Sequence, residues 1–228
     1  MYNERRSIVP GAVVWCSATS GPLDVLPDGC MDLIWMKGEL VLAGPDSRPY
    51  REHARAGERY TGLRFPPGML PRLLAVPANE LRDSREALRD VAATDAVKRL
   101  VDRLGHGDDP AACLESFALD QRHAQPDART STIVRLIASH ESVSTVADHV
   151  NVSERQLHRW SLRLFGYGPK TLARILRFQA ALRLAKAGHS GAEVATRSGY
   201  ADQAHLLRET RQLAGTSFAQ LTGARAVA

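Results

Sequence analysis

Two segments in the last hundred residues carry similar side chains at the same spacing. The first runs Ser153-Glu-Arg-Gln-Leu157-His-Arg159 and the second runs Asp202-Gln-Ala-His-Leu206-Leu-Arg208, at an offset of 49 residues. Arginine can form two hydrogen bonds to O6 and N7 of guanine, and glutamine can do the same to N6 and N7 of adenine. Arginine also occurs on solvated helix faces and against phosphates, so the side-chain types alone leave these alternatives open.

The basic residues are concentrated in the half of the chain that holds these segments. Residues 124–228 contain 14 Lys and Arg against 7 Asp and Glu, whereas residues 1–123 contain 16 against 18. The net charges of the two halves are therefore +7 and −2. This asymmetry indicates that the C-terminal half meets a polyanion and that the N-terminal half has a different task.

Each of the two segments follows a short predicted helix and a turn. The helices are expected at 144–150 and 191–198. Ser153 and Asp202 are good N-caps for the next helix, because their side-chain oxygens can accept hydrogen bonds from its free N–H groups. A helix, a short turn and a second capped helix form a helix-turn-helix, and the sequence predicts two of them. A long amphipathic helix is expected between them at 169–187, ended by Gly188.

The first 65 residues show short apolar runs broken by Gly and Pro, which is typical of a β domain. Strands are expected at 12–16, 23–26, 31–36, 39–43 and 60–65. Pro27-Asp28-Gly29 predicts a turn, and Lys37-Gly38 predicts a two-residue hairpin loop. Short helices are expected from Pro66 onward, at 69–74 and 79–83, then from Thr94 to Leu104, and after the cap Asp109 with Pro110 at the first position.

Composition sets the wider bounds. The chain has 228 residues, 44% of them hydrophobic and 24% charged, which excludes collagen-like, low-complexity and wholly disordered classes. The sequence contains neither an apolar run long enough to span a membrane nor a convincing signal peptide, so a cytoplasmic location is expected. Cys16, Cys30 and Cys113 are widely spaced, and their odd number favours reduced thiols. A linker at Gln125-Pro126-Asp127 predicts two domains, 1–125 and 126–228.

Residues 130–222 resemble the DNA-binding domain of AraC/XylS transcription regulators. The resemblance is carried by Val146-Ala147, Ser153…Leu157…Arg159, Leu164-Phe165-Gly166, 174–184, Glu193-Val194-Ala195, 199–205 and Gly215-Thr216-Ser217. Phe218 departs from the family, which usually has proline there, and this leaves the start of the last helix open. The segments 26–35, 43–46 and 62–65 resemble the β-rich, cupin-like sensor half of a subgroup of these regulators.

The resemblance implies an α+β two-domain regulator that binds double-stranded DNA and needs no cofactor. By resemblance, base-reading positions are occupied by Arg155, His158 and Arg159 on the first recognition helix, and by Gln203, His205 and Arg208 on the second. Ser153 at a helix N-terminus is a natural phosphate anchor, and Arg163, Arg174 and Arg211 are expected to contact phosphates or to form surface ion pairs. Contacts with RNA polymerase, a homodimer, and activation as opposed to repression stay open.

The N-terminal half is expected to respond to a small-molecule effector. Trp15 and Trp35 are large apolar groups that can bound a mainly apolar pocket, with Asp32 and Arg64 beside it. Alternation along 31–36 sends Met31, Leu33 and Trp35 to one face and Asp32 to the other, where a solvated or edge-strand Asp32 is favoured over a ligand contact. The alternative is a solid core, which would leave this half to protein contacts only.

Two other kinds of chemistry are disfavoured. Cys16, Cys30 and His53 show no His-x-His or Cys-x-x-Cys spacing, so structural cysteines are favoured over a metal site. A DNA-repair alkyl acceptor fused to the same DNA-binding domain would need a four-thiolate zinc site, and three scattered cysteines cannot build one. We therefore expect a regulator and not an enzyme.

Overall fold

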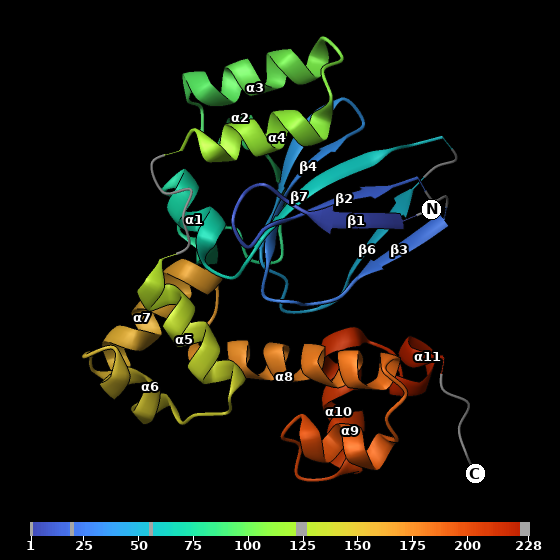
Figure 1. Ribbon diagram of the computed structural model, residues 1–228, viewed down its shortest axis with the longest axis vertical. Helices are drawn as coiled ribbons and strands as arrows, with labels where there is room; N and C mark the ends of the chain where they lie inside the picture. Colours follow the sequence, from blue (N-terminus) through green and yellow to red (C-terminus); the bar gives the residue numbers. More distant parts are fainter. Residues whose placement is uncertain (1, 19–20, 55–56, 122–126, 224–228) are drawn as a thin grey trace.

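A β-rich N-terminal part and an all-helical C-terminal part pack against each other (Figure 1). This computed structural model describes residues 2–18, 21–54, 57–121 and 127–223. Each part has its own hydrophobic core, so the predicted α+β organisation is confirmed. The linker residues Gln125 and Pro126 lie outside the described residues, and the boundary at 125 stays a prediction.

In the described part of the chain, eight strands form two sheets. The strands are β1 (Tyr2–Arg6), β2 (Val13–Ser17), β3 (Gly21–Val25), β4 (Met31–Met36), β5 (Glu39–Ala43), β6 (Tyr50–Ala54), β7 (Tyr60–Phe65) and β8 (Arg85–Ala87). Six of them form a sheet in the order β1-β2-β7-β4-β5-β8, while β3 and β6 pair separately. Every pairing is antiparallel.

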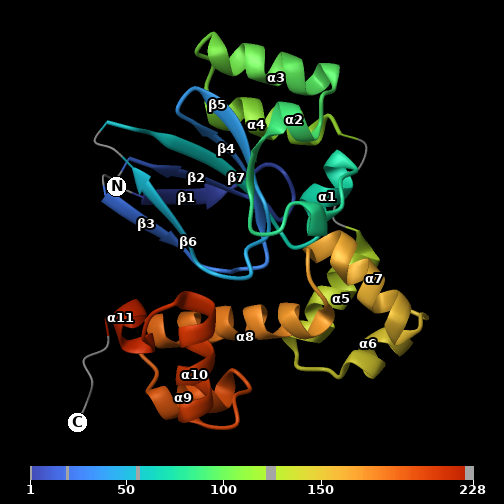
Figure 2. The ribbon, with the colours of Figure 1, turned by 180° about the vertical axis from the view of Figure 1, so that it is seen from behind.

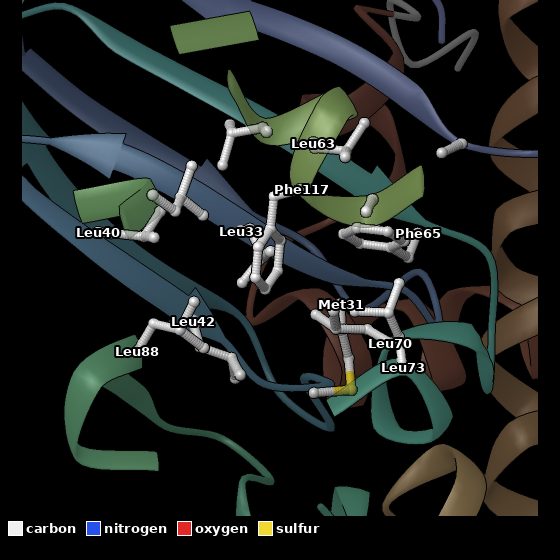
Figure 3. Packing of buried hydrophobic residues seen from close by; sticks show 14 of the residues in the cluster. Met31, Leu33, Leu40, Leu42, Leu63, Phe65, Leu70, Leu73, Leu88 and Phe117 are labelled. Atoms are coloured by element: carbon white, nitrogen blue, oxygen red, sulfur yellow. The ribbon is translucent and has the colours of Figure 1, made fainter. Parts of the chain in front are cut away.

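Strand alternation gives the large sheet two different faces, because successive side chains of a strand point to opposite sides. Met31 and Leu33 of β4 and Leu63 and Phe65 of β7 are buried on one face, where they pack against Phe117 and its helical neighbours (Figure 3). Asp32, between Met31 and Leu33, points to the opposite face. The second face is therefore free to line a cavity.

Short helices cover the apolar face of the sheet. They are α1 (Met69–Leu74), η1 (Ala78–Glu80), α2 (Leu88–Val91), α3 (Asp95–Gly105) and α4 (Pro110–Leu119). Thr94 and Asp109 cap α3 and α4 as predicted, each accepting a hydrogen bond from the N–H three residues on. Figure 2 shows α2, α3 and α4 grouped on the side of the sheet away from α8 (Pro169–Lys186).

The C-terminal part contains the predicted pair of helix-turn-helix units. Its helices are α5 (Ala128–Ala138), α6 (Val143–His149), α7 (Glu154–Phe165), α8, α9 (Gly191–Arg197), α10 (Gln203–Ala214) and α11 (Phe218–Thr222). The last helix does begin at Phe218, because Ser217 and Gln220 form a reciprocal capping box in the absence of proline.

Several elements differ from the sequence predictions. Strands β1, β6 and β8 were not expected, because their polar sequences lack the alternation of a half-buried strand; β1 is exposed along its length at the sheet edge. The helix expected at 79–83 is only the 3₁₀ turn η1, and Asp83 takes a left-handed φ of 58°. The Lys37-Gly38 hairpin is confirmed, with positive φ at both residues.

Glu115 ties the N-terminal strand to α4. Its carboxylate accepts two hydrogen bonds from the Arg5 guanidinium, both 2.9 Å, and others from Ser7 Oγ and the Ile8 N–H. The Glu115 side chain is only 5% exposed. Hydrogen bonding by Arg5 is the largest cause that lowers the pKa of Glu115 to about 2. Folding is therefore coupled to ionisation of this carboxyl.

We expect Glu115→Gln to remove part of the acid sensitivity of folding. Because the folded-state pKa lies below the ordinary 4.5, the stabilisation is complete above about pH 5 and is lost as pH falls toward 2. Between about pH 6 and about pH 3.5 the native protein should lose about 1 kcal/mol more than the Gln variant, in urea unfolding at each pH. Parallel pH profiles for the two proteins would contradict this assignment.

Candidate nucleic-acid interface and interdomain pocket

The first helix-turn-helix unit consists of α6, a short turn and α7. Ser153 Oγ accepts a hydrogen bond from the Gln156 N–H at 3.2 Å, and Gln156 Oε1 accepts one from the Ser153 N–H at 2.9 Å. This capping box fixes where α7 begins. Leu157 is fully buried, which turns Arg155, His158 and Arg159 outward to solvent on the first two turns.

The second unit, α9 and α10, repeats this arrangement. Asp202 caps α10 by accepting from the His205 N–H at 2.6 Å, and Leu206 is fully buried in the place that Leu157 occupies in α7. Gln203, Ala204 and Arg208 are exposed. Asp202 and Leu206 therefore orient α10 as Ser153 and Leu157 orient α7, and the predicted repeat is confirmed at the level of caps and core.

Helix α8 joins the two units. Its 18 residues make it about 27 Å long at 1.5 Å per residue. Arg174 Nε and Arg177 Nη2 contact the buried carboxylate of Glu209 on α10 at 2.8 and 3.3 Å. Arg174 thus has a structural partner, which fits the ion-pair alternative and not a phosphate contact. These bonds hold α10 at a fixed place on α8.

Arg163 lies at the edge of a shallow basic hollow between α1, α5 and α7. Arg72, Arg129 and Arg163 line it, and its volume is about 250 Å³. The Arg129 guanidinium lies over the Trp160 ring, 5.1 Å from its centroid. Arg72 is 3.9 Å from Asp127, so one of the three positive charges is partly balanced.

A larger pocket of about 540 Å³ lies between the second face of the sheet, the β3–β6 ribbon and α8. Its apolar wall includes Trp15, Ile34, Val41 and Leu182. Gln179 of α8 also lines it and donates a hydrogen bond to the Pro27 carbonyl at 2.7 Å. The pocket is therefore closed partly by the helix that joins the two helix-turn-helix units.

A charged cluster occupies one wall of this pocket. Arg64 Nε lies 3.5 Å from both Asp28 and Asp32, and it is buried without a hydrogen-bond partner. Asp32 also accepts a hydrogen bond from Trp15 Nε1 at 2.5 Å. Burial raises the pKa of Asp32, while Arg64 opposes this shift. An unmatched donor beside two carboxylates gives the pocket a polar anchor within an apolar cavity.

The segment Gly44–Asp46 in the pocket wall packs against the C-terminal end of α7, the first recognition helix. Gly166 ends α7 with φ of 83°, and a Cβ there would lie 2.5 Å from Pro45 Cγ. Gly44 and Asp46, on either side of Pro45, both line the pocket. Asp46 is held by two hydrogen bonds from Arg85, at 2.9 and 2.6 Å. A short segment of backbone therefore connects the cavity to the end of α7.

Two family descriptions match the chain. "Helix-turn-helix domain" matches residues 146–223, and "Domain of unknown function (DUF6597)" matches residues 12–87. Apo ToxT from Vibrio cholerae has a TM-score of 0.51 and 12% identity, covering 96% of this chain and 99% of that one. ToxT bound to (E)-4-(8-methylnaphthalen-1-yl)but-3-enoic acid has a TM-score of 0.51 and 11% identity, covering 97% and 98%. No curated protein sequence matches significantly.

The domain match covers both helix-turn-helix units, and ToxT has a similar two-part fold along nearly the whole chain. The C-terminal part is a helix-turn-helix domain of the AraC type. This domain supports a role for the protein in DNA-binding transcription regulation. Within the described part of the chain, no helix combines the length and apolar character needed to cross a membrane.

The sequence-predicted pocket residues are only partly brought together. Trp15, Asp32 and Arg64 line the cavity of the regulator. Trp35 does not, and its prediction was wrong: it shares the face of Met31 and Leu33 and packs against the N-terminal core. The prediction of a solvated or edge-strand Asp32 was also wrong, because β4 lies between β7 and β5 and the β3–β6 ribbon and α8 cover this face.

The predicted DNA-contacting residues differ in accessibility. Ser153, Arg155, His158, Arg159, Arg163, Gln203 and Arg208 are exposed. His205 is half-buried, and its ring meets Tyr200 edge-on at 5.1 Å between centroids. The three cysteines are described and free, and Cys113 is buried. The side chain of His53 lies outside the described residues.

Sequence reasoning missed the pocket residues that come from distant segments. Gln179, Leu182 and Lys186 of α8 line the cavity from the DNA-binding half. Gln179 lies on the apolar face of the predicted amphipathic helix. A polar residue on such a face was the sequence feature that could have indicated a contact with a distant segment. The Arg85–Asp46 pair had no local signal, because its members are far apart in the sequence.

Proposed function

We propose that this regulator reads two neighbouring DNA half-sites with α7 and α10, and that a small organic effector in the interdomain pocket controls that binding. The effector would be mainly apolar, with one polar group that meets the cluster of Arg64, Asp28 and Asp32. The observation that carries the proposal is the pocket itself, since its wall includes side chains of α8. ToxT, which has a similar fold, is seen bound to a naphthalenyl butenoic acid.

The arrangement supplies a physical route from effector to DNA. Because α10 is fixed to α8 by the Glu209 ion pairs, while the end of α7 packs against Pro45, a shift of α8 against the sheet would change the relation of α7 to α10. The Gln179–Pro27 hydrogen bond and the Pro45–Gly166 contact are the links that such a shift would break or remake. To turn a mostly inactive population into a mostly active one, the effector must prefer one arrangement by about 5 kcal/mol.

On the DNA side, we assign base contacts to Arg155, His158 and Arg159 of α7 and to Arg208 of α10. Each is exposed on the outer surface of a capped helix whose opposite side is buried. Ser153 at the α7 N-terminus and Arg163 beside the basic hollow are assigned to phosphate contacts. Gln203 and His205 reach DNA only if their side chains turn away from the α9–α10 junction.

Filling the cavity is expected to weaken ligand binding without unfolding the protein. Ile34 points into the pocket from the middle of β4, so Ile34→Trp adds bulk where the effector would lie. We expect 8-anilinonaphthalene-1-sulfonate to bind the native protein saturably at one site, and to lose at least about tenfold in affinity in the variant, measured by fluorescence titration.

The matched control is Ile8→Trp, which makes the same change at a side chain that is 66% exposed. It should bind the probe as the native protein does. Equal binding by Ile34→Trp and Ile8→Trp, or no saturable binding by the native protein, would contradict a ligand pocket. The N-terminal half would then be left with protein contacts alone, while the assignment of DNA contacts would stand.

A further inference from the structure

Leu207 is an exposed leucine on the second recognition helix. Its side chain is 40% exposed, and no other large apolar side chain among the described residues of the C-terminal half is as accessible to solvent. Its neighbours Leu206 and Leu213 form the core beneath α10. A single exposed leucine is ordinary on a protein surface, so its exposure alone does not indicate a binding site. The place of Leu207 on α10 is what distinguishes it.

The internal repeat aligns Leu207 with a residue on the first recognition helix. At the offset of 49 residues, Ala204 and Leu207 correspond to Arg155 and His158, while Arg208 corresponds to Arg159. All six side chains are exposed. The first unit thus has two arginines and a histidine at these positions, with the His158 ring beside Gly168, whereas the second has two apolar groups and one arginine.

The polar side chains of Gln203 and His205, which could also contact bases from α10, point toward α9. His205 packs edge-on against Tyr200, and a Cβ at Gly191 would lie 2.8 Å from Gln203 Nε2, so both side chains lie against the α9–α10 junction. Arg208 and Arg211 are exposed on the same helix and supply positive charge toward a phosphate backbone. The outer surface of α10 is therefore apolar at Ala204 and Leu207 and basic beside them.

We propose that Leu207 contacts the C5-methyl group of thymine in the half-site bound by α10. Thymine is the base that presents a methyl group in the major groove, where it favours apolar side chains. The small side chain of Ala204 lets the helix approach the bases, and Arg208 bonds a neighbouring guanine. This inference rests on the proposed docking of α7 and α10, and it makes the two half-sites chemically different. A single copy of the regulator then binds its operator in one orientation.

The test removes the methyl group and nothing else. Sites are first selected from random duplexes with the full chain, and each thymine is then replaced by deoxyuridine. We expect replacement at one or two positions, all in one half-site, to weaken binding by about fourfold each, the effect of burying one methyl-sized apolar group. Leu207→Ala should weaken binding by a similar factor and should be insensitive to deoxyuridine at those positions.

Two control variants test whether the effect is specific to Leu207. Leu119→Ala makes the same change at a leucine that is 41% exposed on α4, and it should bind DNA as the native protein does. His158→Ala, at the equivalent position of the first unit, should keep the full sensitivity to deoxyuridine. The deoxyuridine series on the native protein does not depend on the folding of any variant.

Selected sites without thymine in either half-site, or unchanged binding after every deoxyuridine replacement, would overturn the assignment of Leu207. Sensitivity that persists in Leu207→Ala would overturn it as well. Failure to select any sequence would instead count against the base contacts assigned to α7 and α10, so the two failures are distinguishable.

Discussion

Replacing Arg155 and Arg159 together with alanine is expected to lower affinity for the selected DNA site by about 30-fold to 10⁴-fold. Each arginine is exposed on the first two turns of α7, and a bidentate contact to guanine contributes about 1–3 kcal/mol of discrimination. The two side chains are one turn apart, so their effects will not add strictly. The measurement is titration of selected and random duplexes at one fixed salt concentration.

A matched control removes two exposed arginines from the N-terminal half, Arg48 and Arg99. It lowers the net charge equally and should change the affinity by less than about twofold at moderate salt. If these arginines contact bases, the Arg155/Arg159 variant should bind random DNA nearly as well as the native protein does. Equal weakening on both duplexes, with the salt slope reduced by about 1.8, would reassign these arginines to phosphates.

Gly44→Ala is expected to destabilise the N-terminal part by about 3 kcal/mol or more. A Cβ at this position would lie 1.6 Å from the carbonyl oxygen of Leu81, and this neighbour is backbone, which cannot rotate away. The Gly44 N–H also donates to the Ser84 carbonyl at 3.0 Å, so the two segments cannot separate without losing that bond. Overpacking of this kind usually costs 1–3 kcal/mol, and a backbone clash costs more.

The control is Gly105→Ala, at the end of α3, where the added Cβ meets no atom within 4 Å. It should stabilise the protein by about 0.5–1 kcal/mol, because alanine loses less backbone entropy than glycine in a helix. Urea unfolding measures both variants. A Gly44→Ala protein as stable as the native one would show that the Gly44–Leu81 approach is looser than the structure has it.

The position of Gly44 also connects stability with function. Pro45 follows it and touches Gly166 at the end of α7, while Gly44 and Asp46 line the pocket. A backbone shift at Gly44 would therefore reach both the cavity and the first recognition helix. We expect mild variants at this segment to change the coupling between effector and DNA before they change either affinity alone.

The sequence by itself determined the features that depend on neighbouring residues. Ser153 and Asp202 cap their helices through hydrogen bonds to N–H groups three residues on, and these bonds need no other part of the chain. The repeat at 49 residues placed two similar units on either side of α8. In β4, the alternation of Met31 and Asp32 correctly separated two faces of one strand.

Only the tertiary structure decided what covers each face. Trp15 and Trp35 both follow the alternation of their strands, yet helices cover the face of Trp35, while the β3–β6 ribbon and α8 enclose a cavity over Trp15. Gln179 reaches Pro27 across 152 residues. Local propensity and periodicity fix which side chains share a face, but the partner of that face depends on packing between distant segments, and no local pattern contains it.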